Sequence, residues 1–375
     1  MKKVIAFCKR EMVLSIAFCL AVVSSLVVLP DKEYISYIDF RTLSLLFCLM
    51  GVMAGFQKIG VFRSIAGKLL EKVRNVRTLV FILIGLCFFF SMLITNDVAL
   101  ITFVPFTFLV LDFLEEELRD RLFIPVVVFQ TIAANLGSMF TPIGNPQNLY
   151  LYGKAGWGIG EFLLIMAPYT GLSLFLLILF GWRIGGMEKQ GLQVQIEKEK
   201  PSAGAVTIGM YLALFLLCLL TVVRVLPYYV CLGIALLVFV ILDREILKKI
   251  DYCLLLTFVC FFVFIGNMGR IPAFSDLLSR IVEGNEVYCG VAFSQCISNV
   301  PAALLLSGFS EGYQDILIGV NLGGLGTLIA SMASLISYKL VAVNRPESKG
   351  KYLKQFTFWN IVFLIMIMLF YLLLR

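Results

Sequence analysis

The chain contains 375 residues, of which 60% are hydrophobic and only 15% are charged. Soluble domains are about half apolar and about a quarter charged, so the composition excludes an ordinary soluble fold and indicates an α-helical membrane protein. The net charge of +7 raises the possibility of a nucleic-acid partner. Because the basic residues fall in short segments between apolar runs, we expect the lipid bilayer as partner and no nucleic acid.

The residue types also limit the chemistry that the chain can perform. Histidine is absent, and the ten cysteines include no Cys-x-x-Cys pair. The usual ligand sets for zinc and haem and the Ser-His-Asp triad are therefore missing. We expect no enzymatic activity, no catalytic residue, no cofactor, and no metal beyond a transported or coupling cation.

The first half of the chain predicts four membrane crossings and one hairpin. The crossings, in chain order, are 12–30, 40–57, 122–153 and 160–183. An amphipathic stretch at 58–77 predicts an arm that lies on the membrane surface. After it, the apolar region 78–112 is interrupted at its centre by a polar tripeptide, which predicts a re-entrant hairpin on the cytoplasmic side.

The second half predicts five crossings and a second hairpin. The crossings are 205–226, 228–242, 252–268, 315–338 and 356–374. The region 287–310 is again interrupted at its centre, and each apolar arm has 10 or 11 residues. Helical arms of that length reach only about 15–17 Å, half a bilayer, so they predict a hairpin that enters and leaves on the outer side.

The distribution of Lys and Arg predicts the orientation. With the N-terminus in the cytoplasm, the inner segments carry 24 of the 31 Lys and Arg residues, and seven remain at or near outer ends. The positive-inside rule favours this arrangement over the reversed one. The inner segments are 1–11, 58–77, 113–121, 183–204, 243–250 and 339–355. We therefore predict a multi-pass protein of the cytoplasmic (inner) membrane.

An internal repeat is visible when the two halves are aligned. Four blocks match in the same order: Ile38-Asp39-Phe40 with Ile250-Asp251-Tyr252, Ile94-Thr95-Asn96 with Ile297-Ser298-Asn299, Asn135-Leu136-Gly137 with Asn321-Leu322-Gly323, and Thr141 with Thr327. An odd number of crossings separates the matched elements, so the repeats are inverted, as in many secondary transporters. We assign repeat one to 1–184, a linker with one span to 185–227, and repeat two to 228–375.

Polar or helix-breaking residues at membrane depth predict the site. Breaks in matching positions of both halves are typical of a transporter binding site, because unpaired backbone groups in hydrocarbon need protein or water beside them. The alternative is packing, since Asn and Ser often join helices and Gly allows close approach. The predicted ion-binding residues are Thr95, Asn96, Asp97, Asn135, Gly137, Ser138, Thr141, Gly144, Asn145, Ser298, Asn299, Asn321, Gly323, Gly326 and Thr327.

Asp97 is the one carboxylate that this topology places at a hairpin tip, and repeat two has Val300 in the equivalent position. An acidic residue inside a membrane suggests a role in proton or cation coupling. The alternative role is to cap the second hairpin arm, since Asp accepts hydrogen bonds from the free N–H groups at a helix start. Both roles are compatible.

The chain resembles the ion transporter superfamily, which includes arsenite permeases, citrate and dicarboxylate permeases, divalent anion–sodium symporters and one class of sodium–proton antiporters. The resemblance covers nearly the whole chain and rests on TNDVALITFVPF (95–106), GSMFTPIGNPQNL (137–149), SQCISNVPAALLL (294–306) and GVNLGGLGTLIASMASLISYKL (319–340). It implies an elevator-type transporter that assembles as a homodimer, with hairpins and broken helices in a moving domain.

Departures from the dicarboxylate symporters affect the expected substrate. Those proteins typically show Ser-Asn-Thr at both tips, whereas this chain has Asp97 and Val300 at the third positions. We expect a secondary transporter for a small anion or oxyanion, coupled to a proton or sodium. The first alternative is a sodium–proton antiporter that uses Asp97 without an anion. The second is an intramembrane enzyme or a non-transporting structural protein.

Overall fold

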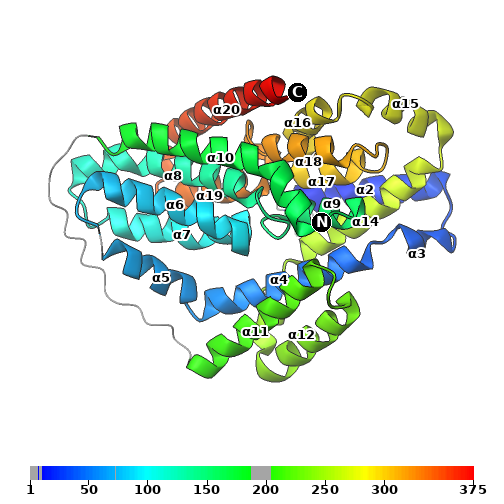
Figure 1. The fold of residues 1–375 in the computed structure, drawn as a ribbon, viewed down its shortest axis with the longest axis horizontal. Helices are drawn as coiled ribbons and strands as arrows, with labels where there is room; N and C mark the ends of the chain where they lie inside the picture. Colours follow the sequence, from blue (N-terminus) through cyan, green and yellow to red (C-terminus); the bar gives the residue numbers. More distant parts are fainter. Residues whose placement is uncertain (1–6, 8–10, 72, 187–203) are drawn as a thin grey trace.

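A computed structural model describes residues 7, 11–71, 73–186 and 204–375 (Figure 1). Most of the basic N-terminal segment and residues 187–203 of the predicted linker lie outside the described residues. All regular secondary structure within the described ranges is helical. Seven helices there are long and apolar enough to cross a membrane, so the prediction of an all-α polytopic membrane protein is confirmed.

The first half contains α2 to α10. Their bounds are α2 Met12–Val27, α3 Glu33–Tyr37, α4 Phe40–Lys58, α5 Val61–Leu70, α6 Val76–Ile94, α7 Asn96–Leu111, α8 Glu116–Ser138, α9 Pro146–Ala155 and α10 Ile159–Ile184. The second half contains α11 to α20 and two short 3-10 helices. Their bounds are α11 Ala205–Val222, α12 Tyr228–Leu242, α13 Arg244–Leu247, α14 Tyr252–Gly269, α15 Pro272–Val282, α16 Glu286–Ile297, α17 Asn299–Leu306, α18 Tyr313–Leu322, η1 Leu328–Ala330, α19 Met332–Asn344, η2 Pro346–Ser348 and α20 Lys349–Leu374.

Each interrupted apolar region folds as two helices that meet at one strained residue. Helices α6 and α7 meet at Thr95, which has φ 70° and ψ 151°, and α16 and α17 meet at Ser298, which has φ 74° and ψ 154°. A positive φ is unfavourable for a side chain with a Cβ and persists only where the surrounding structure holds it. The two tips therefore share one unusual backbone conformation. Helices α16 and α17, with 12 and 8 residues, are too short to cross a bilayer separately.

The two helices with internal Gly and Pro residues are broken near the middle. Helix α8 ends at Ser138 and α9 begins at Pro146, while α18 ends at Leu322 and α19 begins at Met332. Residues 139–145, with Gly144, separate the first two halves, and residues 323–331, with Gly323, Gly326 and the short η1, separate the second two. Gly137 lies inside α8. The predicted breaks in 122–153 and 315–338 are thus present.

The hairpins pack on the broken helices in a matching pattern. Helix α6 packs on α8 and α16 packs on α18, whereas α7 packs on α19 and α17 packs on α9. Each hairpin therefore contacts both broken helices. In Figure 1, α6, α7, α8 and α19 lie on one side of the molecule, and α9, α16, α17 and α18 lie together on the other.

Two glycines allow the close approach of hairpin and broken helix. A Cβ built on Gly137 would lie 2.1 Å from the Phe88 carbonyl oxygen and 2.6 Å from the Ser91 Oγ. A Cβ built on Gly323 would lie 2.6 Å from the Ser294 Oγ. The predicted site residues Gly137 and Gly323 thus have a packing role at the two crossings.

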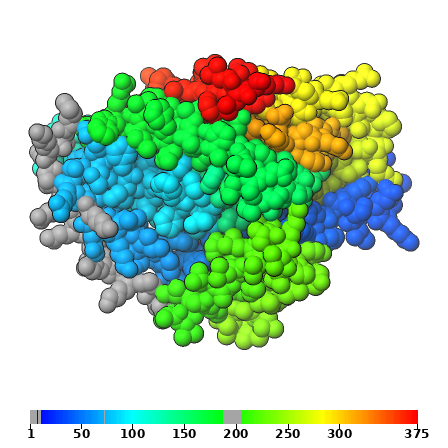
Figure 2. All heavy atoms as spheres, viewed as in Figure 1, coloured from blue at the N-terminus to red at the C-terminus, as the bar shows by residue number. Residues whose placement is uncertain are grey.

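The remaining helices surround this centre. Helices α11 and α12 pack on α4, and α2 packs on α14. Figure 2 shows α11 and α12 projecting as one lobe, while α20 covers the opposite edge of the same view. Because α4 and α14 also border α9 and α17, respectively, they connect the outer helices to the centre.

We expect Gly137→Ala to lower the thermal stability of the purified protein in detergent, because the new methyl group would collide with a backbone oxygen that cannot move alone. Overpacking of this kind costs about 1–3 kcal/mol. The matched control is Gly171→Ala in α10, where nothing lies within 4 Å of the added Cβ. Equal melting temperatures for the two variants would contradict this packing role.

Candidate functional site

The first hairpin tip is bound to the broken helix of its own repeat through Asn135. The Asn96 Nδ2 donates to the Asn135 Oδ1 over 3.1 Å, and the Asn96 backbone N–H donates to the Gly144 carbonyl over 3.1 Å. The Asn96 Oδ1 accepts from the Asp97 N–H over 2.9 Å, which caps the start of α7. The tip is therefore fixed by its asparagine, and the Asp97 side chain does not supply this cap.

Asn135 also reaches the second broken helix. Its Oδ1 accepts from the Ser331 Oγ over 3.0 Å, and its Nδ2 donates to the Ser334 Oγ over 3.3 Å. Ser331 occupies the N-cap position of α19. The starts of α7 and α19 thus meet at one buried amide.

Asn321 makes the equivalent contacts from the second broken helix to the first. Its Oδ1 accepts from the Asn145 Nδ2 over 3.1 Å, and its Nδ2 donates to the Asn148 Oδ1 over 2.7 Å. Asn145 is the N-cap of α9, where its Oδ1 also accepts from the Asn148 N–H over 2.9 Å. Asn145 additionally donates to the Ser138 Oγ over 3.3 Å.

These contacts form a reciprocal set, which we call the asparagine clasp. It consists of Asn135, Asn145, Asn148, Asn321, Ser331 and Ser334. Asn135 binds Ser331 and Ser334, which lie 10 and 13 positions after Asn321. Asn321 in turn binds Asn145 and Asn148, which lie 10 and 13 positions after Asn135. The clasp satisfies buried polar groups at both helix breaks, as required where water is excluded.

The other predicted residues of the first half support the clasp from nearby. The Ser138 Oγ donates to the Asn135 carbonyl over 2.9 Å, and the Thr141 Oγ1 donates to the Met92 carbonyl. A Cβ on Gly144 would lie 2.0 Å from the Ser138 carbonyl oxygen. These residues shape the loop after α8, and the structure brings them together beside the clasp.

The second half is less uniform. Asn299 and Ser298 are buried at the second tip, and the Ser298 Oγ donates to the Asn299 Oδ1 over 3.5 Å. Gly326 (φ 107°) and Thr327 instead border Gln295 on α16, whose Oε1 accepts from the Thr327 N–H over 2.8 Å. Thr327 is exposed, so it lies at the flank of the predicted cluster and not within it.

Two side chains beside the clasp hold polar atoms without hydrogen-bond partners among the described residues. The Oδ1 of Asp97 is buried and has no partner. Gln147, in the first turn of α9, is 1% exposed, and neither its Nε2 nor its Oε1 has a partner. Unsatisfied buried groups of this kind are costly unless a ligand or water completes them, so they are the strongest binding candidates here.

Helix starts add a second source of polarity. Helices α7, α9, α17 and α19 all begin at a hairpin tip or a helix break. The free N–H groups and the dipole at a helix N-terminus favour an anion. The arrangement thus offers N–H donors for an anion and the Asp97 carboxylate for a cation or proton.

The sequence interpretation missed Asn148, Ser331 and Ser334 in the clasp, and also Gln147. The signal that could have found them is the repeat itself, because extending the alignment beyond Thr141 pairs Asn145 with Ser331 and Asn148 with Ser334. Gln147 pairs with an alanine in the other half, so the repeat gives no signal for it. Only its position beside Asn145 and Pro146 could have indicated it.

Comparison with known proteins gives the family. The citrate transporter family model matches residues 4–312. The inner membrane protein YbiR of Escherichia coli is 30% identical over 314 residues, 82% of each chain. The uncharacterized transporter MJ0456 of Methanocaldococcus jannaschii is 32% identical over 317 residues, 84% of each chain. The silicon efflux transporter LSI3 of rice is 30% identical over 161 residues, 42% of this chain and 32% of that one. The chain is a membrane protein that belongs to the citrate transporter family.

Proposed function

We propose that the chain is a secondary active transporter that moves a small anion or oxyanion across the cytoplasmic membrane, coupled to a proton or sodium ion. The observation that carries this proposal is the asparagine clasp at two matched helix breaks, flanked by unsatisfied polar atoms of Asp97 and Gln147. The substrate would bind at the tips beside the clasp, contacted by Asn96, Asn299 and the helix starts.

Matched structural details support two inverted repeats. Asp39 and Asp251 have nearly the same backbone angles, φ −80° and ψ 84° against φ −79° and ψ 83°, and each caps the helix that follows. The tips share one conformation, the glycines at the two crossings each face a serine, and the clasp is reciprocal. Four independent matches in one order favour a duplicated unit over chance similarity.

An elevator movement would explain how the site changes sides. The clasp joins the two broken helices, Asn96 binds the first hairpin to it, and the second hairpin packs on both broken helices, so the four elements form one unit. Helices α4 and α14 border this unit and pack on α11, α12 and α2. We infer that the central unit moves along α4 and α14, which act as a scaffold. A homodimer would hold the scaffolds still in the bilayer.

A sodium–proton antiporter remains the alternative. The free Oδ1 of Asp97 favours it, because a single carboxylate can exchange one cation for another without any anion. The two functions differ in one measurable property, which is whether an anion crosses with the cation.

The inverted topology predicts the accessibility of the tips. In a cysteine-free background, single cysteines at Thr95 and Ser298 should be labelled by an impermeant thiol reagent from opposite faces of the membrane. Cysteines at Glu33 and Lys248, both exposed, serve as sidedness controls for the outside and the inside. Labelling of both tips from one face under every condition would refute the inverted arrangement.

The coupling role of Asp97 predicts a pH effect. Since a proton and a cation would compete for its carboxylate, cation-dependent flux in liposomes should weaken as the pH falls. Asp97→Asn should abolish this pH dependence and leave either no coupled flux or an uncoupled leak. Asp112→Asn, at the other end of α7 and exposed, is the matched control and should keep the wild-type profile.

A purely structural role, in which the charge of Asp97 stabilises the first turn of α7 through the helix dipole, gives a different result for the same variant. If Asp97 only stabilises the start of α7, Asp97→Asn should lower the melting temperature while the pH profile of flux stays like that of the wild type. That outcome would remove Asp97 from the coupling mechanism.

A further inference from the structure

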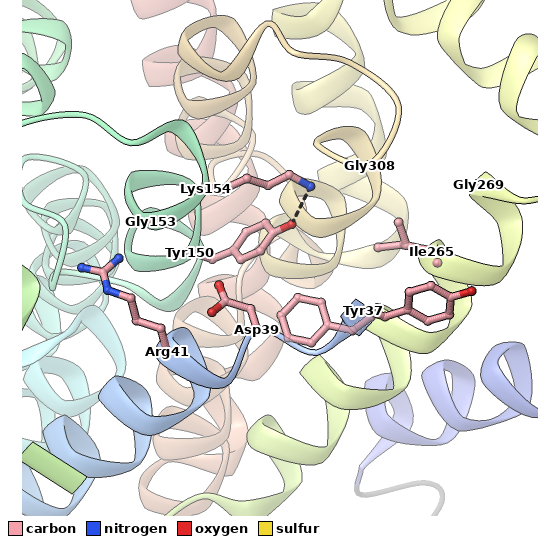
Figure 3. Close-up of a pocket in the computed structure, with 11 residues that line it drawn as sticks. Tyr37, Asp39, Arg41, Tyr150, Gly153, Lys154, Ile265, Gly269 and Gly308 are labelled. Atoms are coloured by element: carbon pink, nitrogen blue, oxygen red, sulfur yellow. Dashed lines mark hydrogen bonds between the residues drawn. The ribbon is translucent and has the colours of Figure 1, made fainter. Parts of the chain in front are cut away.

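A cavity of about 420 Å³ lies between the central unit and the inferred scaffold, apart from the clasp. Figure 3 shows its lining. Tyr37, Asp39 and Arg41 come from the end of α3 and the start of α4, Tyr150 and Lys154 from α9, and Ile265 from α14. The positive-inside bias assigns these helix ends to the outer face, so the cavity would open outward.

The three charged residues of the lining are held differently. The Asp39 carboxylate caps α4, accepting from the Thr42 N–H over 2.9 Å. The Arg41 guanidinium is directed away from Lys154 and donates to the Val222 carbonyl over 3.1 Å. Asp39 interacts electrostatically with both Arg41 and Lys154, so one carboxylate faces two cations and the lining keeps a positive excess.

Lys154 is the cation that remains for a ligand. Its side chain is exposed in the cavity, and its Nζ donates to the Tyr150 Oη over 3.2 Å (Figure 3). An ammonium group has three donors, so two are left for another acceptor. Tyr150 in turn contacts the Ser307 Oγ over 3.0 Å, which positions the pair against the end of α17.

The equivalent positions of the other half carry different residues. The alignment that pairs Asp39 with Asp251 also pairs Arg41 with Cys253. The alignment that pairs Asn135 with Asn321 also pairs Lys154 with Leu340. Neither cation is repeated at its own position, although Lys249 stands opposite Tyr37. Asp251 instead interacts electrostatically with Asp97. The repeats thus match in backbone but differ in where their basic residues stand.

We infer that this cavity is an anion vestibule, in which Lys154 binds a carboxylate or another small oxyanion before it reaches the tips. The inference rests on the proposed anion transport. It adds Lys154 as a positioning residue on the outer side only. Its volume exceeds that of a small organic acid, so the anion can enter with part of its hydration. Helix α9 leads from Lys154 to its N-cap Asn145 over nine residues, a distance of about 13–14 Å along the axis.

The test measures the charge preference of the cavity directly. In a cysteine-free background, Ile265→Cys would react with an anionic and a cationic methanethiosulfonate, 2-sulfonatoethyl and 2-(trimethylammonium)ethyl, on detergent-solubilised protein. A Tyr37→Cys reporter provides a second position. Adding Lys154→Gln should lower the anionic-to-cationic rate ratio about tenfold, since one nearby charge acts oppositely on the two reagents. Lys154→Arg should preserve the ratio.

Lys32→Gln is the matched control, because it removes an exposed lysine from the same face outside the cavity. It should leave the ratio unchanged. The same Lys154→Gln variant in liposomes should raise KM for the transported anion with little change in maximal rate. Equal ratios for Lys154→Gln and Lys32→Gln would overturn the vestibule. Absence of any anion flux in the wild type, with the ratio still lowered by Lys154→Gln, would instead overturn the proposed function.

Discussion

Two helices are broken in the middle of apolar segments, which leaves polar backbone and side-chain groups that lipid cannot satisfy. Each unsatisfied group costs several kcal/mol. The asparagine clasp meets this requirement from inside the protein. Asn135 and Asn321 each use a carbonyl and an amide group to bind the loop and helix start of the other half. The hairpins can approach this centre because Gly137 and Gly323 carry no side chain where they cross it.

The residues of the clasp that support the helix breaks differ from the groups that are available to bind a ligand. Most asparagines at the centre are saturated by one another, so they hold the helix starts in place and have little capacity left for a ligand. The free capacity lies beside them, in the Asp97 carboxylate, in the Gln147 amide and in the N–H groups of the first helical turns. A rigid, satisfied core with a few unsatisfied atoms at its edge suits a transporter, because the site must bind an ion and later release it.

Most of the architecture could be predicted from the sequence, because the signals were local. The polar tripeptides marked both hairpin tips, and Gly marked both helix breaks, accompanied by Pro in the first half. The clasp partners Ser331 and Ser334 could not be assigned, since a serine in an apolar helix looks the same whether it packs or binds. Lys154 and Arg41 are 113 positions apart in the sequence, and they line the same cavity only in the folded chain. Thr327 lies at the flank of the cluster, and its motif position does not reveal that its N–H donates to Gln295.

The central claim is that an anion moves with a coupling cation through the site beside the clasp. The most direct test is uptake by the purified wild-type protein in liposomes, using labelled citrate, phosphate and sulfate under an imposed sodium or proton gradient. The account predicts that at least one anion accumulates above its external concentration and leaks out when an ionophore dissipates the gradient. A sodium pulse that changes the internal pH, with no accumulation of any small anion tried, would contradict it and favour the antiporter.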